Sequence, residues 1–223
     1  MIARNSLIAG LFLLSAIPAL AQPDDLTAGA YVGLRGSYAF SGNATATYAP
    51  TAPPTALRAS YASGGGGSLY LGTRLPLNLR LELEALYRWQ PVSKASINGG
   101  DLAASGRTKL AAPMLNLFWD IPVPLDMQVQ PFVGMGVGAA YAETDVNGGG
   151  NSYIHQNRWD LAYSFMGGLA MPLDYGTRLT AMYRWIKTPD AGHKCALSGS
   201  LQSVCLDNSV TSQAVDLGLE MDL

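Results

Sequence analysis

The sequence predicts an all-β fold: an eight-stranded antiparallel transmembrane β-barrel with short periplasmic turns and long outer loops. Eight segments have strand character, and several alternate apolar and polar residues with the period of two that a strand requires. The connections between the segments alternate between short turns and long loops. Aromatic residues mark the ends of the apolar faces. Together these features are typical of barrels that cross a membrane with strands.

The N-terminus is typical of a secretory signal peptide. Arg4 supplies a positive charge, "LIAGLFLLSAIPAL" is apolar, and Ala19-Leu20-Ala21 fits a cleavage site. The alternative is a membrane anchor, which the short apolar stretch disfavours. We therefore expect cleavage between Ala21 and Gln22, a leader over residues 22–28, and a barrel over residues 29–223.

The composition is unusual for a soluble domain. Charged residues make up 13% of the 223 residues, about half the usual share, and glycine is abundant. The net charge is −2 and the Lys and Arg residues form no basic run, so no nucleic-acid partner is expected.

The expected strands follow one another along the whole mature chain. They are residues 31–40, 68–75, 79–89, 108–120, 127–142, 158–171, 177–187 and 209–223. Short turns rich in Pro, Asp and Asn lie around Pro76 and Asn78, at "IPVPLD" and at "PLDYG". The long connections are 41–67, 90–107, 143–157 and 188–208. We expect "GGGG" (64–67) to be a flexible loop edge and "ATATYAPTAPPTA" (44–56) to be a mobile outer loop.

The segment "LRLELEALYRW" (79–89) shows the alternation best, with one apolar face and one charged face. Only Leu86 breaks the polar series. A soluble barrel would bury the apolar face and a membrane barrel the charged face. Glycines on the polar faces, Gly134, Gly136, Gly138 and Gly218, favour the second, because they leave room for long side chains inside a narrow barrel. The expected charge network in the lumen is Arg80, Glu82, Glu84, Arg88, Arg178, Arg184, Asp216 and Glu220. Arg35, Arg74 and Asp120 are expected among the same inward charges. A buried set of this kind must be paired, and it would fill the lumen.

Aromatic residues end the apolar faces on both sides of the expected membrane. Tyr87, Trp89, Tyr183 and Trp185 lie at the loop side and Trp119 at the turn side. We interpret them as the interfacial girdle of a membrane barrel. Aromatic capping of a soluble core is the alternative.

At this point the chain resembles the small outer-membrane β-barrel proteins that include the OmpA transmembrane domain and the opacity-type surface antigens. The resemblance covers roughly residues 29–223 and rests on "YVGLRGSYAF", "PMLNLFWD", "QPFVGMGVGAAYA" and the alternating last strand. The family commonly ends on an aromatic residue that the barrel assembly machinery recognises, whereas this chain ends on Leu223. The resemblance implies a bacterial outer-membrane location, with outer-membrane lipid, lipopolysaccharide and the assembly machinery as partners.

The two cysteines, Cys195 and Cys205, lie in one expected loop, and a disulfide is the natural interpretation in an oxidising compartment. The alternative is a metal site that adds His193, although the spacing matches no common zinc pattern. His155 could meet Asp145 or Asp160, but neither histidine has a serine two residues away, as a lipid-A deacylase-like site would need. Glu82 and Glu84 are neighbours on one face, and ion pairing explains them better than acid–base catalysis. We therefore expect no catalytic residue, no metal and no cofactor.

These observations favour a non-enzymatic surface protein with a filled lumen, a monomer that contributes to envelope integrity and presents its loops. The alternative is an adhesin or a barrel whose loops bind a small ligand of the haem type. A small channel and a lipid-modifying enzyme are the weaker alternatives.

Overall fold

The computed structural model describes residues 29–40, 42–48, 55–97, 100–102, 104–124, 128–148, 152–188, 194–198, 201–206 and 211–223. The expected signal peptide, its cleavage site at Ala21 and Gln22, and the leader lie outside these residues, so those expectations remain predictions.

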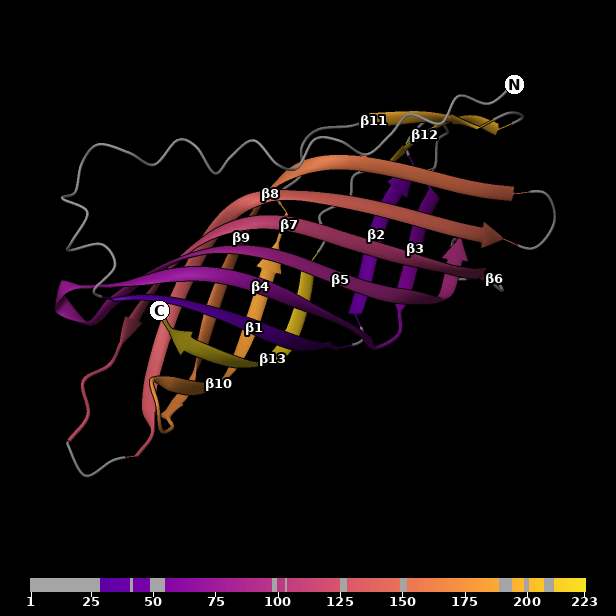
Figure 1. Cartoon of the computed structure of the whole chain (residues 1–223). Coiled ribbons are helices and arrows are strands. Elements are labelled where there is room, and N and C mark those ends of the chain that lie inside the picture. Colours follow the sequence, from indigo (N-terminus) through magenta and orange to yellow (C-terminus); the bar gives the residue numbers. More distant parts are fainter. Residues whose placement is uncertain are drawn as a thin grey trace, which may run out of the picture.

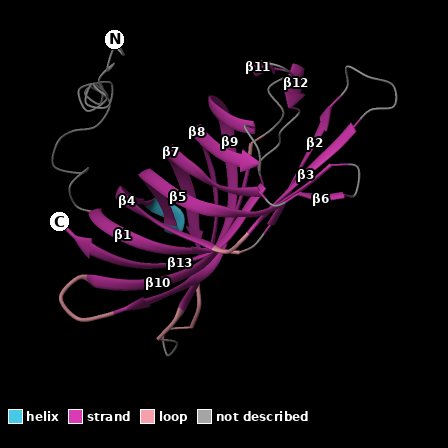
Figure 2. Cartoon of the chain, turned by 90° about the vertical axis from the view of Figure 1, so that its right-hand side faces the viewer, coloured by secondary structure: helices cyan, strands magenta, loops and turns pink. Residues whose placement is uncertain are grey.

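A closed ring of eight strands forms the barrel wall, as expected (Figures 1 and 2). The strands are β1 (Ala30–Ala39), β4 (Gly64–Leu75), β5 (Leu79–Ile97), β7 (Ala104–Asp120), β8 (Gln130–Gly148), β9 (Ser152–Pro172), β10 (Thr177–Lys187) and β13 (Thr211–Asp222). Each strand is antiparallel to both neighbours, and β1 pairs with β13 to close the ring. Because a closed barrel has no free edge, every wall strand has a hydrogen-bonding partner on both sides.

Short connections lie at one end of the barrel, which we call the turn end. One is the 3-10 turn η1 (Pro76–Asn78), and another joins β9 to β10. In each of these two turns a pair of consecutive residues has positive φ: Leu77 with Asn78, and Tyr175 with Gly176. Tight hairpins need positive φ at both central positions, where Asn and Gly are the preferred residues. Leu77 and Tyr175 therefore depart from the usual turn chemistry.

The opposite end, the loop end, holds more regular structure than expected. β2 (Gly42–Tyr48) pairs with β3 (Thr55–Tyr61), and β11 (Lys194–Ser198) pairs with β12 (Leu201–Leu206). The short strand β6 (Gly100–Leu102) pairs with β5, and β8 and β9 remain paired to Gly148 and Ser152. The expectation of a mobile loop over 44–56 was therefore wrong for 44–48 and 55–56. A hairpin of Ala and Thr residues satisfies its own backbone hydrogen bonds. Its sequence has no clear alternation of apolar and polar residues, so the strands could not be predicted from that pattern.

The expectation that "GGGG" (64–67) is a loop edge was also wrong, because these glycines begin β4 and pair with β1 and β5. A Cβ at Gly64 would overlap the carbonyl of Trp89, and one at Gly66 would overlap the carbonyl of Tyr87. Glycine here lets β5 approach closely, which is one of the roles it takes inside a strand.

The inward-facing glycines make room for side chains from the next strand. A Cβ at Gly134 would overlap the ring of Phe118, and one at Gly136 would overlap Asn116 Oδ1. Four glycines were expected to make room for long charged side chains. Only Gly218 borders one, because a Cβ at Gly218 would lie 2.8 Å from Arg35 Cγ. The others make room for aromatic, amide and thioether groups.

Replacing Gly134 with alanine is expected to lower the free energy of unfolding by about 1–3 kcal/mol, because the Phe118 ring must move in a filled interior. The matched control is Gly36→Ala, an outward position where a Cβ would meet no described atom within 4 Å. That control should be neutral or stabilising by up to ~1 kcal/mol. Urea unfolding of both proteins in lipid vesicles measures the difference, and equal effects would contradict the packing argument.

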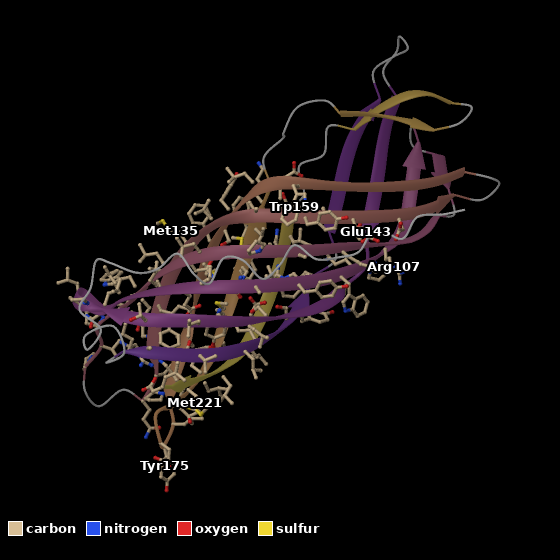
Figure 3. All side chains as sticks on the ribbon, turned by 45° about the horizontal axis from the view of Figure 1, so that its top comes forward. Arg107, Met135, Glu143, Trp159, Tyr175 and Met221 are labelled. Carbon is tan, nitrogen blue, oxygen red and sulfur yellow. The ribbon has the colours of Figure 1, made fainter. Side chains whose placement is uncertain are left out.

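The wall presents an apolar outer surface. Met135, Trp159 and Met221 project away from the barrel, and Tyr175 lies at the tip of the turn end (Figure 3). In β5, Leu81, Leu83, Tyr87 and Trp89 are exposed, whereas the charged residues between them are buried. Within the described residues, no helix is long and apolar enough to cross a membrane.

Candidate functional site

A column of alternating charges runs through the lumen from the turn end toward the loop end. It begins with Arg178, Asp120 and Arg80, where the guanidinium groups lie 3.4 and 3.0 Å from the same carboxylate. Glu82 follows, 3.1 Å from Arg80 and 2.7 Å from Arg35. Each carboxylate thus lies between two arginines, an arrangement that compensates charges removed from water.

The column continues through Glu84, which is its best-connected member. Arg184 donates to both oxygens of this carboxylate, at 2.7 and 2.9 Å, in the bidentate geometry that suits a guanidinium. Arg35, Ser68 and Asn116 also donate to it. Glu84 therefore accepts hydrogen bonds from four residues that come from four different strands.

Beyond Glu84 the column ends near the loop end. Asp216 lies 2.7 Å from Arg184 and 3.2 Å from Arg88, whose guanidinium also donates to Ser212. Glu220 lies beside the column, 3.3 Å from Arg80. The network contains five arginines and five carboxylates: Arg35, Arg80, Arg88, Arg178, Arg184, Glu82, Glu84, Asp120, Asp216 and Glu220. Its formal charge sums to zero.

All eight residues of the expected network lie in it, together with Arg35 and Asp120, which the sequence also placed among the inward charges. Arg35 and Asp120 are both buried on inward-facing positions of their strands. Arg74 lies elsewhere: it pairs with Asp222 at the turn end, where both side chains are partly exposed.

Aromatic rings line the column. The Arg35 guanidinium lies 3.5 Å from the centre of the Tyr70 ring, and that of Arg80 lies about 5 Å from Phe118 and Phe132. The Tyr31 hydroxyl donates to Glu82 at 2.8 Å. These rings hold the cations by cation–π attraction and exclude water from one side of the network.

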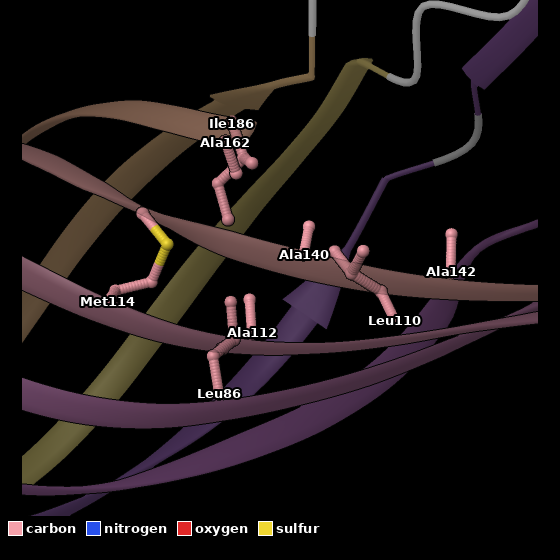
Figure 4. Close-up of a cluster of buried hydrophobic side chains, with 8 residues drawn as sticks. All are labelled: Leu86, Leu110, Ala112, Met114, Ala140, Ala142, Ala162 and Ile186. Atoms are coloured by element: carbon pink, nitrogen blue, oxygen red, sulfur yellow. The ribbon is translucent and has the colours of Figure 1, made fainter. Parts of the chain in front are cut away.

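Two clusters of buried apolar side chains lie on β5, β7, β8, β9 and β10, beside the column. The outer apolar cluster consists of Leu86, Leu110, Ala112, Met114, Ala140, Ala142, Ala162 and Ile186. The inner apolar cluster consists of Phe118, Phe132, Met166, Ala170 and Met182. Figure 4 shows the outer cluster, with side chains from five strands directed into the enclosed space. Leu86, which breaks the polar series of 79–89, is explained by its place in this cluster.

A cavity of about 440 Å³ opens at the turn end of the lumen. The turns before β5 and β10 lie at its rim, and Arg80, Asp120, Gln130 and Arg178 line it. Arg178 donates to the side-chain oxygen of Gln130 at 2.7 Å. The cavity therefore reaches the first ion pairs of the column. The described residues contain no group of three or more His, Cys, Asp or Glu side chains placed to hold a metal ion.

Backbone register places the two cysteines and one of the two histidines. Cys195 in β11 lies directly opposite Cys205 in β12, and His155 in β9 lies opposite Asp145 in β8. Opposed residues of antiparallel strands have Cα atoms about 4.5–5.5 Å apart, which is compatible with a disulfide. The disulfide remains a prediction, since these side chains lie outside the described part. His193 lies outside the described residues altogether.

Comparison with known proteins decides the family. Residues 9–219 match the family described as "Outer membrane protein beta-barrel domain". The chain belongs to this family. The resemblance to small outer-membrane barrels is thereby confirmed, as is the bacterial outer-membrane location, with its surrounding lipid and lipopolysaccharide.

The relatives agree with this family. A protein of Gluconacetobacter diazotrophicus named "Outer membrane protein" is 29% identical over 199 residues, which cover 82% of this chain and 52% of that protein. The chain thus spans about half the length of this curated relative. Neisserial surface protein A has a TM-score of 0.52 at 17% identity, with 87% of this chain and 97% of that chain covered. OprG from Pseudomonas aeruginosa has a TM-score of 0.53 at 15% identity, with the same coverage of 87% and 97%.

The outer-membrane barrel carries its expected girdle residues on the outward face. Tyr87, Trp89, Trp119 and Tyr183 are exposed, and Trp185 is half-buried because it stacks on Phe165 with ring centres 5.9 Å apart. Sequence reasoning missed Phe165. Its place on an outward-facing position two residues from Tyr163 in β9 was the available signal.

Proposed function

We propose that this chain is a non-enzymatic outer-membrane barrel with a filled lumen, which adds to envelope integrity and presents surface loops. The observation that carries the proposal is the neutral column of five arginines and five carboxylates, packed against two apolar clusters. A network of ten buried, ion-paired side chains would occupy the space in which a pore would have to run. We further propose that the protein is a monomer inserted by the barrel assembly machinery, with Tyr87, Trp89, Trp119, Tyr183 and Trp185 at the membrane interfaces.

Planar-bilayer recording tests the filled lumen. Purified wild-type protein, shown to be folded by a gel mobility that changes on boiling, should give no openings above background. Regular openings from folded protein would contradict the proposal. For the envelope role, a strain that lacks the gene should become more sensitive to detergent, and the wild-type gene should restore resistance.

A second candidate function is ligand capture by the outer hairpins. It is favoured by the paired strands at the loop end, β2 with β3 and β11 with β12, which offer a more ordered platform than free loops. Haemin is the probe, and its absorbance change on binding is the readout. Deletion of residues 194–206 should abolish haemin binding while the barrel still folds, and unchanged binding would contradict this candidate.

A further inference from the structure

The cavity at the turn end is large enough for a small ligand, and its wall is charged. Its volume of about 440 Å³ falls within the range of about 300–1,000 Å³ that is usual for pockets that hold small molecules. The charged residues of its lining are Arg74, Arg80, Arg178, Asp120 and Asp222, so the lining carries one positive charge in excess. The short turns of an outer-membrane barrel face the periplasm, and the cavity therefore opens to that compartment.

Arg178 has the weakest carboxylate pairing among the five arginines of the charged column. Its nearest carboxylate oxygen in the described chain belongs to Asp120, at 3.4 Å, and the next belongs to Glu220, at 4.0 Å. Asp120 is also shared with Arg80, which lies closer to it, at 3.0 Å. The one short hydrogen bond printed for Arg178, 2.7 Å long, goes to the neutral amide oxygen of Gln130. Since its side chain is only 9% exposed, this cation is poorly compensated by charge and nearly removed from bulk water.

The other two arginines of the cavity lie at its inner end and at its rim. Arg80 is 1% exposed, and its Nη2 has no hydrogen-bond partner among the described residues, although buried donors normally have one. Arg74 is 35% exposed, pairs with Asp222 at 2.7 Å and lies 4.9 Å from the centre of the Tyr31 ring. The exposure of the three arginines thus decreases from the rim inward, and positive charge follows the cavity over its depth.

We infer that the turn-end cavity binds a small oxyanion, a carboxylate or phosphate group, from the periplasm. A guanidinium group suits either ligand, because its fork of donors matches two oxygens at once. Arg178 donates to the anion, Arg74 attracts it at the rim, and Arg80 adds positive charge at the inner end. Behind Arg80 the ion pairs continue to Glu82, so the site is a blind pocket that needs no passage through the lumen. The inference goes beyond the proposed function, which requires no ligand at this end.

The test is calorimetric titration of the folded, full-length barrel in detergent micelles. Inorganic phosphate and citrate are the two probes, and sodium chloride keeps the ionic strength constant so that general screening does not count as binding. The wild type is expected to bind at least one probe saturably. Arg178→Gln should weaken that binding at least about tenfold, because it removes a charge-assisted hydrogen bond from a nearly buried site. Asp120 keeps its ion pair with Arg80 in this variant.

Two arginine variants at the cavity are each matched with a control at the loop end. Arg88→Gln is the control for Arg178→Gln, since it also removes a buried arginine of the column and leaves Asp216 paired with Arg184 at 2.7 Å. Lys109→Gln is the control for Arg74→Gln. Lys109 is 29% exposed and pairs with Glu143 at 3.1 Å, much as Arg74 pairs with its own partner.

Binding of phosphate alone, of citrate alone or of both supports the inference, and the difference identifies the group that the site prefers. Binding should weaken in both cavity variants and stay at the wild-type level in both controls. Absence of saturable binding of either probe would overturn the inference, as would equal weakening in a cavity variant and its control. If Arg178→Gln does not fold, as judged by gel mobility with and without boiling, Arg74→Gln and Lys109→Gln decide under the same criteria.

Discussion

Replacing Glu84 with alanine is expected to lower the free energy of unfolding by about 3–5 kcal/mol. The carboxylate accepts two hydrogen bonds from Arg184 and one each from Arg35, Ser68 and Asn116. Without it, Arg35 keeps Glu82 and Arg184 keeps Asp216, but both lose a buried counterion. The lost compensation, rather than the lost hydrogen bonds alone, sets the size of the effect. Urea unfolding in phospholipid vesicles, followed by tryptophan fluorescence, measures it.

The control for this experiment is Asp222→Ala at the turn end. Asp222 also pairs with an arginine, Arg74, at 2.7 Å, but the two side chains are 45% and 35% exposed. An ion pair in contact with water contributes about 0–1 kcal/mol. Similar losses in the two variants would contradict the conclusion that the ion pairs of Glu84 are shielded from water.

Replacing Leu83 with arginine is expected to destabilise the barrel by about 2–4 kcal/mol, the range found when a cation is placed on the lipid face at the bilayer midplane. Leu83 is 53% exposed and lies near the middle of the outward apolar face of β5. The physical reason is desolvation, because hydrocarbon offers the guanidinium neither water nor a counterion. Equilibrium unfolding in vesicles gives the magnitude.

Leu77→Arg is the matched control for Leu83→Arg. Leu77 is 82% exposed at the turn end, where the side chain leaves the membrane band. The same substitution should change the stability by about 0–1 kcal/mol there. Equal effects at both positions would mean that the outward face of β5 does not lie in the hydrocarbon core.

The sequence predicted the barrel and its charged interior well because both depend on strand period. In β5 and β13 the alternation is nearly complete, so the inward positions of Glu82, Glu84, Asp216 and Glu220 could be read directly. Arg35 and Asp120 were visible as inward charges, but their partners were not. Pairing across the lumen depends on the stagger of non-adjacent strands, and no local pattern encodes that stagger.

The strands at the loop end, such as β2 and β3, and the two apolar clusters were harder to predict from the sequence. β7 carries apolar residues on both faces, so period alone could not separate Met114 and Phe118, which face inward, from Leu115 and Leu117, which face lipid. The hairpin of β2 and β3 contains Ala, Thr and Gly with little contrast between its faces. Its strands form because β3 can pair with the long extension of β5, a partner far away in the sequence.

The charged column also bears on how the barrel assembles. Its members come from both ends of the chain: Arg35 belongs to the first strand, and Asp216 and Glu220 belong to the last. Until β13 docks between β10 and β1, Arg88 lacks its carboxylate and Arg80 lacks one of three, so a half-closed intermediate carries exposed charges that resist entry into lipid. Ring closure and neutralisation of the interior are thus one event. A partly closed barrel is therefore not expected to accumulate as a stable folding intermediate. Folding should be strongly cooperative even though the contacts join residues that are distant in sequence.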